Sequence, residues 1–323
     1  MSRTGQSAGQ RRRKTQVLTH ETASVVRSIT NAVVVKNGEP FFICPPEANL
    51  PLDERHGFGL YHHDTRFLSG YELTVGGQVL TSLASTAAAG TFALLQLSNA
   101  QLIGPRGTIE KETLDVRWSR GIDGGAATLH DTLVIQNLGF ADVAFPLGIR
   151  LSVDFRDMFA VRGLLDERPG RLLRPRWDGQ RLVFAYDGKD GVRRELHVRF
   201  DPAPGRREGA QVGYDVRLKP RAKTELRIDL EIHERAKRGV APIERRTDSR
   251  GPRIRAGPAG TVDPGQWFGD GDWSTSVRTD SLILGQVLSR SLHDLALLRS
   301  GLDGLRFYEA GIPGSRRCSV ATR

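Results

Sequence analysis

The sequence predicts a mainly β protein: a large antiparallel β-sandwich, followed by a linker and one long C-terminal α-helix. Three observations lead to this prediction. Short segments between residues 25 and 235 show the alternation or the β-branched composition of strands, and turn residues separate them. No helical pattern of crossover length lies between them, which disfavours a parallel α/β sheet. A helical period begins only after a stretch rich in proline and glycine.

Two hairpins are predicted near the start of the sandwich. Asn37-Gly38 separates the apolar runs at residues 32–36 and 40–44, and Gly76-Gly77 separates residues 71–75 from residues 78–81. Both dipeptides accept the positive φ angles of the tight turns that join antiparallel strands. We therefore expect each pair of runs to form a two-stranded unit.

The segment at residues 113–118 shows the alternation of a half-buried strand. Leu114, Val116 and Trp118 are predicted on one face, with Asp115 and Arg117 on the other. Further strands are predicted at residues 91–97, 109–118, 127–136, 143–153, 182–186, 195–200, 211–218 and 224–232. We expect these strands to build one sandwich domain over residues 21–235.

Residues 236–270 form a predicted linker, since their prolines and glycines interrupt any regular element. Leucine and valine then recur at three- and four-residue spacing over residues 280–299, which predicts an amphipathic helix capped by Asp280 and ended by Gly301. Few residues follow to cover its apolar face. We therefore expect Leu288, Leu292 and Leu295 to be exposed and to favour self-association.

The charge of the chain is concentrated at its two ends. The formal net charge is +10, of which +5 lies in residues 1–14 and +3 in residues 314–323, leaving +2 for the residues between. Residues 1–20 lack apolar periodicity and are predicted to be a disordered basic tail. A nucleic-acid or anion contact by Arg11–Lys14 is the alternative, but the nearly neutral body argues against a nucleic-acid partner.

Several functional classes lack their sequence signals. No apolar stretch is long enough for a membrane span and no secretory signal is visible, so a cytoplasmic location is expected. Cys44 and Cys318 are too few for a disulfide framework or a thiolate metal site. Phosphate-binding, serine-hydrolase and zinc-protease motifs are missing, and we expect no cofactor.

Three segments resemble the bacterial glycogen debranching enzymes of the amylo-alpha-1,6-glucosidase type. They are Gly59-Leu-Tyr-His-His-Asp-Thr-Arg-Phe-Leu-Ser69, Asp154-Phe-Arg-Asp-Met-Phe-Ala-Val-Arg-Gly163, and the helix with Tyr308-Glu-Ala-Gly-Ile-Pro313. The resemblance implies an N-terminal β-sandwich and a following (α/α)6 domain that carries the glycoside hydrolase site. Residues 271–313 would then be the beginning of that domain.

The resemblance stops at Pro313. The family continues Trp-Phe-Ala-Thr-Leu-Phe-Gly-Arg-Asp-Ser, whereas this sequence reads Gly-Ser-Arg-Arg-Cys-Ser-Val-Ala-Thr-Arg over residues 314–323. A legal coding of these residues, GGT TCG CGA CGC TGT TCG GTC GCG ACT CG, becomes TGG TTC GCG ACG CTG TTC GGT CGC GAC TCG when a preceding T is added and the bases are regrouped. That reading translates into the family sequence. We therefore expect an out-of-frame tail and a truncated catalytic domain.

The densest polar cluster is His62-His63-Asp64 with Arg66. Adjacent histidines on an extended segment point to opposite faces, so we expect no metal site. His63, Asp64 and Arg66 remain candidates for sugar binding. The favoured interpretation is structural: Asp64 and Arg66 form an ion pair or backbone contacts at a corner of the sandwich.

The second segment offers Asp154 and Asp157 as an acid and base pair, but its apolar residues predict an anchored turn after a strand. We expect Asp154, Asp157 and Arg162 to organise an interface with the catalytic domain, together with Trp267 and Trp273 near the linker. Trp118 is expected in the core. No catalytic residue is assigned, since the family's carboxylates lie beyond Pro313.

The sequence therefore favours the N-terminal accessory domain of a glycogen-debranching alpha-1,6-glucosidase, inactive in this form, with an alpha-glucan as the partner of the intact enzyme. The alternative is a stand-alone carbohydrate-binding sandwich module. A polyanion binder that acts through its basic ends is disfavoured.

The frameshift hypothesis makes a direct prediction about the DNA. Re-reading the genomic sequence across codons 305–330 should show the family reading continuing in the neighbouring frame beyond Pro313. A neighbouring frame closed by stop codons would contradict it.

Overall fold

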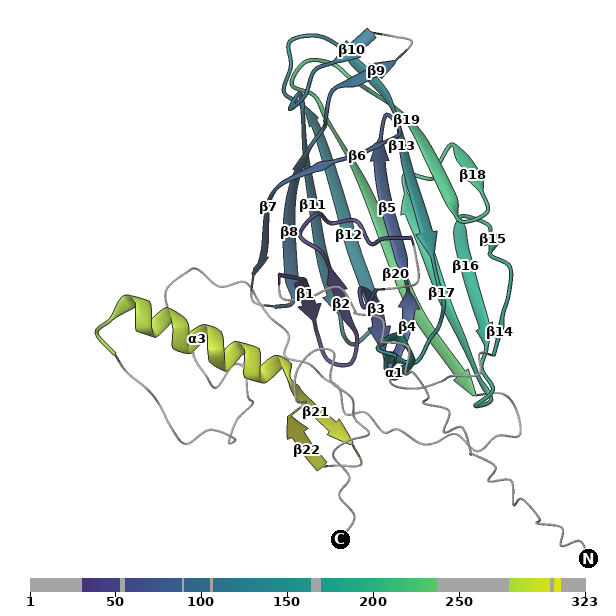
Figure 1. The fold of residues 1–323 in the computed structure, drawn as a ribbon, viewed down its shortest axis with the longest axis vertical. Helices are drawn as coiled ribbons and strands as arrows, with labels where there is room; N and C mark the ends of the chain where they lie inside the picture. Colours follow the sequence, from purple (N-terminus) through teal and green to yellow (C-terminus); the bar gives the residue numbers. More distant parts are fainter. Residues whose placement is uncertain are drawn as a thin grey trace, which may run out of the picture.

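The computed structural model describes residues 31–52, 56–88, 90–104, 107–163, 170–236, 279–302 and 305–308. Within these ranges the predicted fold class is confirmed, because antiparallel strands dominate and stack in layers (Figure 1). The helices of the described part are α1 (Met158–Val161) and α3 (Leu282–Leu297).

A nine-stranded antiparallel sheet forms the larger layer, in the order β14-β16-β17-β20-β12-β11-β8-β7, with β15 also paired to β16. Its long central strands pair over most of their length, and β12 and β20 run side by side from Thr128↔Glu231 to Gln136↔Lys223. The strands are β7 (Thr81–Ala88), β8 (Phe92–Ser98), β11 (Leu114–Asp123), β12 (Thr128–Asn137), β14 (Arg171–Leu172), β15 (Arg176–Asp178), β16 (Arg181–Asp187), β17 (Val192–Asp201) and β20 (Lys223–Ala236).

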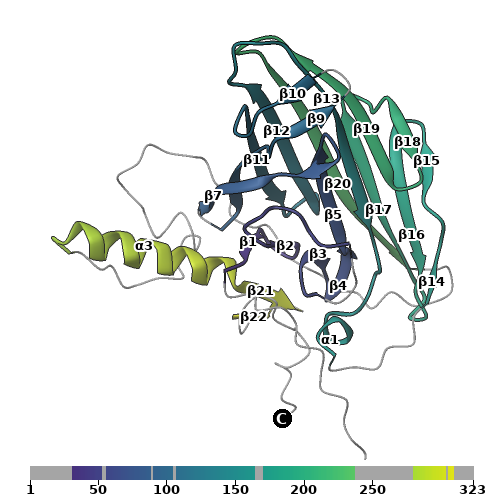
Figure 2. The same cartoon turned by 45° about the horizontal axis from the view of Figure 1, so that its top comes forward.

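A five-stranded sheet in the order β18-β19-β13-β5-β6 packs against it (Figures 1 and 2). Every second residue of β13 is buried, as expected for a strand with one face on the core. The apolar side chains of both sheets belong to one continuous core. The strands are β5 (Gly70–Val75), β6 (Gln78–Val79), β13 (Val143–Ser152), β18 (Arg206–Glu208) and β19 (Gln211–Leu218).

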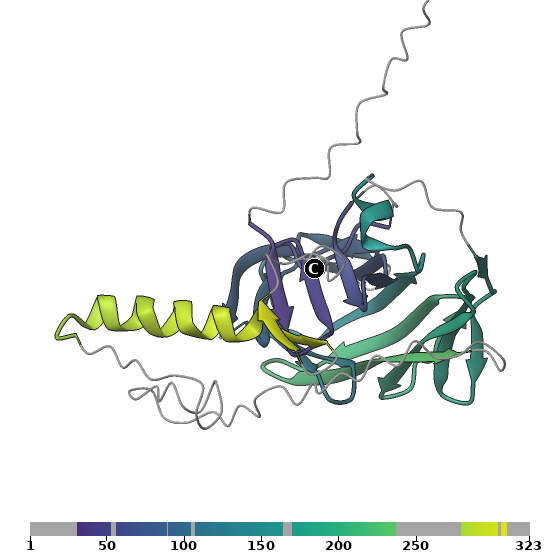
Figure 3. The ribbon, with the colours of Figure 1, turned by 90° about the horizontal axis from the view of Figure 1, so that it is seen from below.

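A four-stranded meander, β1-β2-β3-β4, lies toward the lower end of the sandwich in Figure 1 and faces the viewer in Figure 3. It adds a third layer to the core, because almost all its residues are buried. A two-stranded pair, β9 and β10, lies at the opposite end in Figure 1. The strands are β1 (Val33–Lys36), β2 (Phe41–Cys44), β3 (Gly59–His62), β4 (Thr65–Leu68), β9 (Leu102–Gly104) and β10 (Gly107–Ile109).

The predicted strands agree closely with the structure where alternation is regular. Residues 211–218 coincide with β19, and both predicted hairpins are present, with Gly38 at φ 64° and Gly76 and Gly77 at φ 63° and 79°. The strand predicted at residues 109–118 is instead two strands. β10 ends at Ile109 and β11 begins at Leu114, and Glu112 between them takes a φ of 60°.

The predicted burial of the apolar face of residues 113–118 is confirmed. Leu114, Val116 and Trp118 are buried, and Arg117 is exposed. Asp115 is buried as well, and its carboxylate accepts hydrogen bonds from Gln96 Nε2 at 2.9 Å and Arg117 Nε at 2.9 Å. Neighbouring side chains therefore cover a position that alternation assigns to solvent.

A charged pair lies inside the core between the sheets. Arg120 of β11 and Asp131 of β12 have fully buried side chains, and Arg120 Nε lies 3.5 Å from Asp131 Oδ2. The Arg120 guanidinium sits 3.9 Å from the Trp118 ring centroid and 5.3 Å from that of Tyr71, and Arg120 Nη1 donates to the Ala48 carbonyl at 2.9 Å. Burial raises the pKa of the Asp131 carboxyl, against the opposing effect of Arg120.

The C-terminal helix is present but is capped and ended differently from the prediction. The N-cap is Ser281, whose Oγ accepts from the Leu284 N–H at 3.3 Å, instead of Asp280. The helix ends at Leu297, and Gly301 lies inside β21 (Arg299–Leu302), which pairs with β22 (Leu305–Tyr308).

The apolar side chains of α3 are only partly covered. Leu295 is exposed as predicted, whereas Leu288 and Leu292 are half-buried. The helix extends away from the sandwich in Figure 3, and Arg290 Nη1 donates to the Ala87 carbonyl of β7 at 3.0 Å. Further exposed apolar residues of the helix are Leu282, Ile283, Leu284 and Val287.

Three predicted segments lie outside the described residues: the basic tail at 1–20, residues 237–270 of the linker, and the tail at 314–323. Trp267 and Trp273 lie outside them too. None of the described helices has the length and apolar character needed to cross a membrane.

Removing one partner of the Arg120–Asp131 pair should lower the free energy of unfolding strongly, whereas replacing both partners by apolar residues should lower it little. Asp131→Leu leaves a buried, uncompensated guanidinium, so we expect the free energy of unfolding to fall by about 3–5 kcal/mol in urea denaturation. The double variant Arg120→Met/Asp131→Leu should recover most of this loss. Arg206→Ala, which removes an exposed pair with Asp215, should cost about 1 kcal/mol or less. A single variant as stable as the double variant would contradict this account.

Candidate functional site

The first signature segment forms the β3–β4 hairpin. His62 pairs with Thr65, and the two residues between them, His63 and Asp64, take φ angles of 46° and 64°. Two consecutive positive φ angles are the geometry of the two-residue turn that suits the twist of antiparallel strands. Asp64 therefore lies in a tight turn and not on an extended strand.

The second signature segment follows β13 and docks on this hairpin. The Arg66 N–H donates to the Arg156 carbonyl at 2.9 Å, and the Met158 N–H donates to the Asp64 carbonyl at 2.7 Å. Asp157 caps α1 by accepting from the Phe159 N–H at 2.8 Å. The anchored turn predicted after a strand is confirmed, and the two sequence motifs form one structural corner.

A buried ion pair connects the two motifs. Arg66 is fully buried, and its Nε lies 3.2 Å and 3.1 Å from the two carboxylate oxygens of Asp154, whose side chain is 5% exposed. Arg66 Nη1 donates to the carbonyls of His56 at 2.5 Å and Phe58 at 3.3 Å. Burial opposes the charge on Arg66, but Asp154 outweighs burial and raises the guanidinium's pKa.

This pairing corrects part of the sequence prediction. The carboxylate bound to Arg66 is that of Asp154, not Asp64, because the hairpin turn carries Asp64 away from the face of β4 that Arg66 occupies. The expected backbone contacts at a corner are present. Arg66 is inaccessible to a ligand in this arrangement, since its donors face protein acceptors.

Aromatic rings fill the space beneath the corner. Phe67 and Phe155 meet edge to face at 5.3 Å between ring centroids, and Phe155 stacks on Tyr186 of β16 at 5.4 Å. Phe155 reaches this position with a φ of 50°, which is uncommon for a bulky residue. The corner is thus packed onto the nine-stranded sheet.

A second polar cluster lies beside the hairpin turn. His62 Nδ1 and His63 Nδ1 lie 3.1 Å and 2.5 Å from Glu234 Oε2, near the end of β20. An ionised carboxylate only accepts hydrogen bonds, so each ring carries its hydrogen on Nδ1. Arg194 Nε of β17 donates to Glu234 Oε1 at 3.2 Å.

Burial and charge act in opposite directions at this cluster. Burial raises the pKa of Glu234, but the hydrogen bonds from His62 and His63 outweigh it and hold that pKa well below its ordinary value. Burial lowers the pKa of His62 despite its bond to Glu234. The site therefore favours an ionised Glu234.

The expectation that His62 and His63 point to opposite faces is wrong, because the positive φ of His63 turns both rings toward Glu234. The three residues have the donor types of a metal site. However, both oxygens of Glu234 are already bound, one to the two rings and the other to Arg194. A cation would have to displace these contacts.

The carboxylates of the second motif do not have the arrangement of a glycosidase pair. Such a pair needs one protonated and one ionised carboxyl group on either side of the scissile bond. Asp154 is held in a buried ion pair and Asp157 caps a helix. Arg162 of the same motif is exposed, and nothing tests its expected role at a domain interface.

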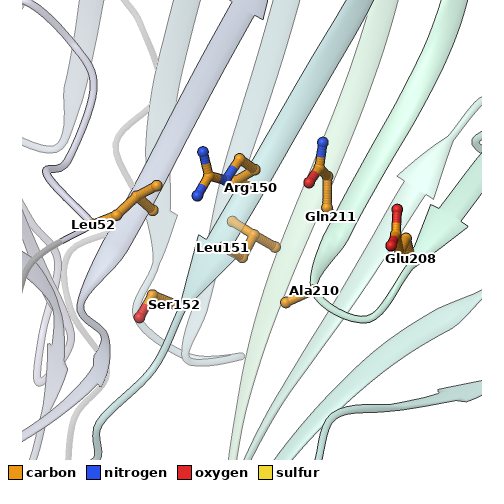
Figure 4. Close-up of a pocket in the computed structure, with 7 residues that line it drawn as sticks. All are labelled: Leu52, Arg150, Leu151, Ser152, Glu208, Ala210 and Gln211. Carbon is orange, nitrogen blue, oxygen red and sulfur yellow. The ribbon is translucent and has the colours of Figure 1, made fainter.

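A groove of about 300 Å³ lies over the end of β13, with the turn of the β18–β19 hairpin on one side and Leu52 on the other (Figure 4). Glu208 is its one carboxylate, and none of its lining residues is aromatic, so it lacks both an acid–base pair and a stacking platform for a sugar. Its lining residues are Leu52, Arg150, Leu151, Ser152, Glu208, Ala210 and Gln211.

Sequence reasoning missed Glu234 and Arg194, which complete the cluster at the hairpin turn. Both lie on the inner face of long strands, where alternation predicts apolar residues. A charged residue at a position predicted to be apolar is the signal that could have indicated them. This signal does not identify the interacting residue, since Glu234 lies 172 residues from His62 in the sequence.

Comparison with known proteins agrees with the motif resemblance. A family model described as the N-terminal domain of (some) glycogen debranching enzymes matches residues 35–229. No curated protein matches the chain.

The fold was also compared with solved structures. One, described as "Putative kojibiose phosphorylase from human microbiome", aligns with a TM-score of 0.47 and 6% identity over 66% of this chain and 31% of that one. A galactose mutarotase-like protein from Lactobacillus casei ATCC 334 aligns with a TM-score of 0.34 and 8% identity over 62% of this chain and 100% of that one. The chain thus spans about a third of the phosphorylase, and neither likeness bears on function.

Gly59 should tolerate no side chain. Its φ is 148°, and a Cβ would clash with the Leu68 carbonyl oxygen and lie 2.8 Å from Arg66 Cδ. We expect Gly59→Ala to lower the free energy of unfolding by roughly 3 kcal/mol, combining a disfavoured φ with overpacking. Gly77→Ala is the matched control, because Gly77 also has a positive φ but no neighbour within 4 Å, and it should cost only about 1–2 kcal/mol. Equal losses in urea denaturation would show that the close approach is unimportant.

The Glu234 cluster should make stability depend on pH. A carboxyl group whose pKa is lowered by folding stabilises the protein above its unfolded pKa of about 4.5 and loses that contribution as the pH falls through the folded pKa. Glu234→Gln should therefore be roughly 2 kcal/mol less stable than the native protein at pH 7. The difference should shrink below pH about 4.5. A difference that is constant from pH 7 to pH 3 in urea denaturation would contradict this.

Proposed function

The chain belongs to the family of N-terminal domains of glycogen debranching enzymes, and from this premise we propose that it is the non-catalytic accessory domain of a glycogen-debranching alpha-1,6-glucosidase. The observation that carries the proposal is the structural role of the charged residues in the two sequence motifs. The conspicuous charged groups of both motifs hold the corner together, and a reacting sugar could not reach Arg66 or Asp154 without unfolding it.

The acid and base of the reaction belong, in this proposal, to a catalytic domain that follows the sandwich, and the alpha-glucan is the substrate of the whole enzyme. Helix α3 supports this arrangement. Its exposed residues Leu282, Ile283, Leu284 and Val287 form an apolar surface that a second domain would cover, and self-association is the expected behaviour when it is left uncovered.

A stand-alone sugar-binding module is not favoured. Such modules present aromatic rings to the sugar face. In the described part of the chain, Trp118 is buried in the core, and the half-buried Trp177 is covered by the Arg207 guanidinium at 4.5 Å. Phe92 and Phe140 are exposed, but they lie on separate segments of the chain, and the Arg221 guanidinium lies 4.9 Å from the Phe140 ring centroid. A cytoplasmic location is part of the proposal and is supported by Cys44, a buried free thiol.

Two measurements on the full chain test this proposal. We expect no glucose release from a branched alpha-glucan and no retardation of the chain in a glycogen-containing native gel. Glucose release that Asp154→Asn abolishes would place the chemistry in the sandwich. Retardation in the gel would instead support the sugar-binding module.

The accessory role predicts association with a catalytic domain. The full chain should co-elute on size exclusion with the separately produced catalytic domain of a family member, and Leu284→Asp/Val287→Asp should abolish this. Leu172→Asp, an equally exposed apolar position on the sandwich, is the matched control and should leave co-elution unchanged. Loss of co-elution in the control alone would reject α3 as the contact surface.

A further inference from the structure

A second histidine cluster lies on the other face of the nine-stranded sheet, on the same two strands that hold Arg194 and Glu234. In the register of β17 and β20, His197 pairs with Glu231 and Glu195 pairs with His233. The partners of an antiparallel pair point to the same side, as do residues two apart on one strand. Four side chains therefore form a square, with the histidines on one diagonal and the glutamates on the other.

The two imidazole rings of this square face each other. Their centroids are 4.2 Å apart with an interplanar angle of 44°. One donor atom each from His197, Glu231 and His233 lies within 4.8 Å of the others. These positions are on three different side chains of two hydrogen-bonded strands, so the backbone already holds them together.

Glu195 sets the tautomer of His197. Its Oε2 lies 2.8 Å from His197 Nε2, and because an ionised carboxylate only accepts, that nitrogen carries the hydrogen. His197 Nδ1 then has a free lone pair. A carboxylate on the distal nitrogen is the arrangement that orients metal-binding histidines and makes them more basic.

Two ring nitrogens of the square make no contact with the rest of the described protein that would occupy them. His197 Nδ1 and His233 Nε2 are buried and make no hydrogen bond among the described residues. Glu231 Oε2 lies 3.5 Å from His233 Nε2, outside hydrogen-bond geometry. Buried polar atoms without partners are rare in folded proteins and call for an explanation.

Three arginines border the site, of which Arg235 is exposed to solvent and the other two are near carboxylates. Arg193 is engaged by Glu195 at 2.8 Å and by Asp187 at 3.2 Å. Arg199 lies 3.5 Å from Glu231 Oε1, which leaves Oε2 available. The cluster around Glu234 on the inner face differs in this respect, because both oxygens of its carboxylate are bound.

We propose that His197 Nδ1, His233 Nε2 and Glu231 Oε2 bind a divalent transition-metal ion, zinc first among them. Two imidazoles and one carboxylate are a donor set that zinc accepts, with a fourth position left for water or another ligand. Zinc bonds of about 2.0–2.1 Å place tetrahedral donors about 3.3 Å apart. The donors would therefore draw together by side-chain rotation, with no change in the register of the strands.

The test uses the full chain and zinc alone. Equilibrium dialysis followed by elemental analysis should find one zinc per chain, and the urea midpoint should rise with zinc concentration, as for any ligand of the folded state. His197→Ala and His233→Ala should each weaken zinc binding by more than about 100-fold, since partners that merely orient a ligand are worth 10- to 100-fold.

Conservative variants distinguish the loss of a zinc ligand from a failure of the alanine variants to fold. Glu231→Gln should weaken zinc binding strongly, and Glu195→Gln should weaken it about 10-fold by loosening the orientation of His197. The native chain substituted with cobalt(II) should show the visible absorption of a low-symmetry site, and His233→Ala should lose it.

Two control variants locate the ion. His130, on the same face, pairs with Asp229 at 2.7 Å, and His130→Ala should bind zinc like the native chain. His63→Ala, in the inner cluster, should also bind normally. No stoichiometric zinc in the native chain, full binding by folded His197→Ala and His233→Ala, or loss of binding only in His63→Ala would each overturn the proposal.

Discussion

Arg66 and Asp154 place a full positive and a full negative charge where water does not reach them. Removing each charge from water costs several kcal/mol, and only close pairing with further hydrogen bonds offsets that cost. The protein supplies both: two carboxylate oxygens and the carbonyls of His56 and Phe58 surround the guanidinium. The hairpin and the segment after β13 consequently hold each other in place, and the four-stranded meander is joined to the five-stranded sheet.

The same requirement explains the centre of the sandwich. Arg120 and Asp131 lie between sheets that are otherwise apolar, and Arg120 is covered by the aromatic rings of Trp118 and Tyr71. In both places charged residues that the sequence alone could suggest as functional groups instead connect parts of the fold. The unpartnered ring nitrogens of His197 and His233 differ from the unpartnered atoms of Arg120 and Asp131, because they lie on the outer face of the sheet beside a carboxylate and can accept a cation.

Local chemistry explains which strands the sequence predicts well. Asn37-Gly38 and Gly76-Gly77 specify tight turns without help from distant residues, and the alternation of residues 211–218 reports one buried face. The β3–β4 hairpin has a weaker signal, because its turn residues His63 and Asp64 tolerate positive φ angles but include no glycine. The second motif holds that turn through the bond from the Met158 N–H to the Asp64 carbonyl. A contact 94 residues along the chain therefore supports this two-residue turn.

The sequence by itself determined the fold class, the family, the core position of Trp118 and the structural character of the two motifs, because each depends on periodicity or on a contiguous run of residues. Only the tertiary structure decided which charges meet. Arg66 meets Asp154 across 88 residues, and Glu234 meets His62 across 172. Strand register places His197 beside Glu231 and His233. The periodicity of the sequence does not show which distant strands pair. That pairing depends on the order of the strands in the sheet and on the free-energy cost of a buried charge without a partner.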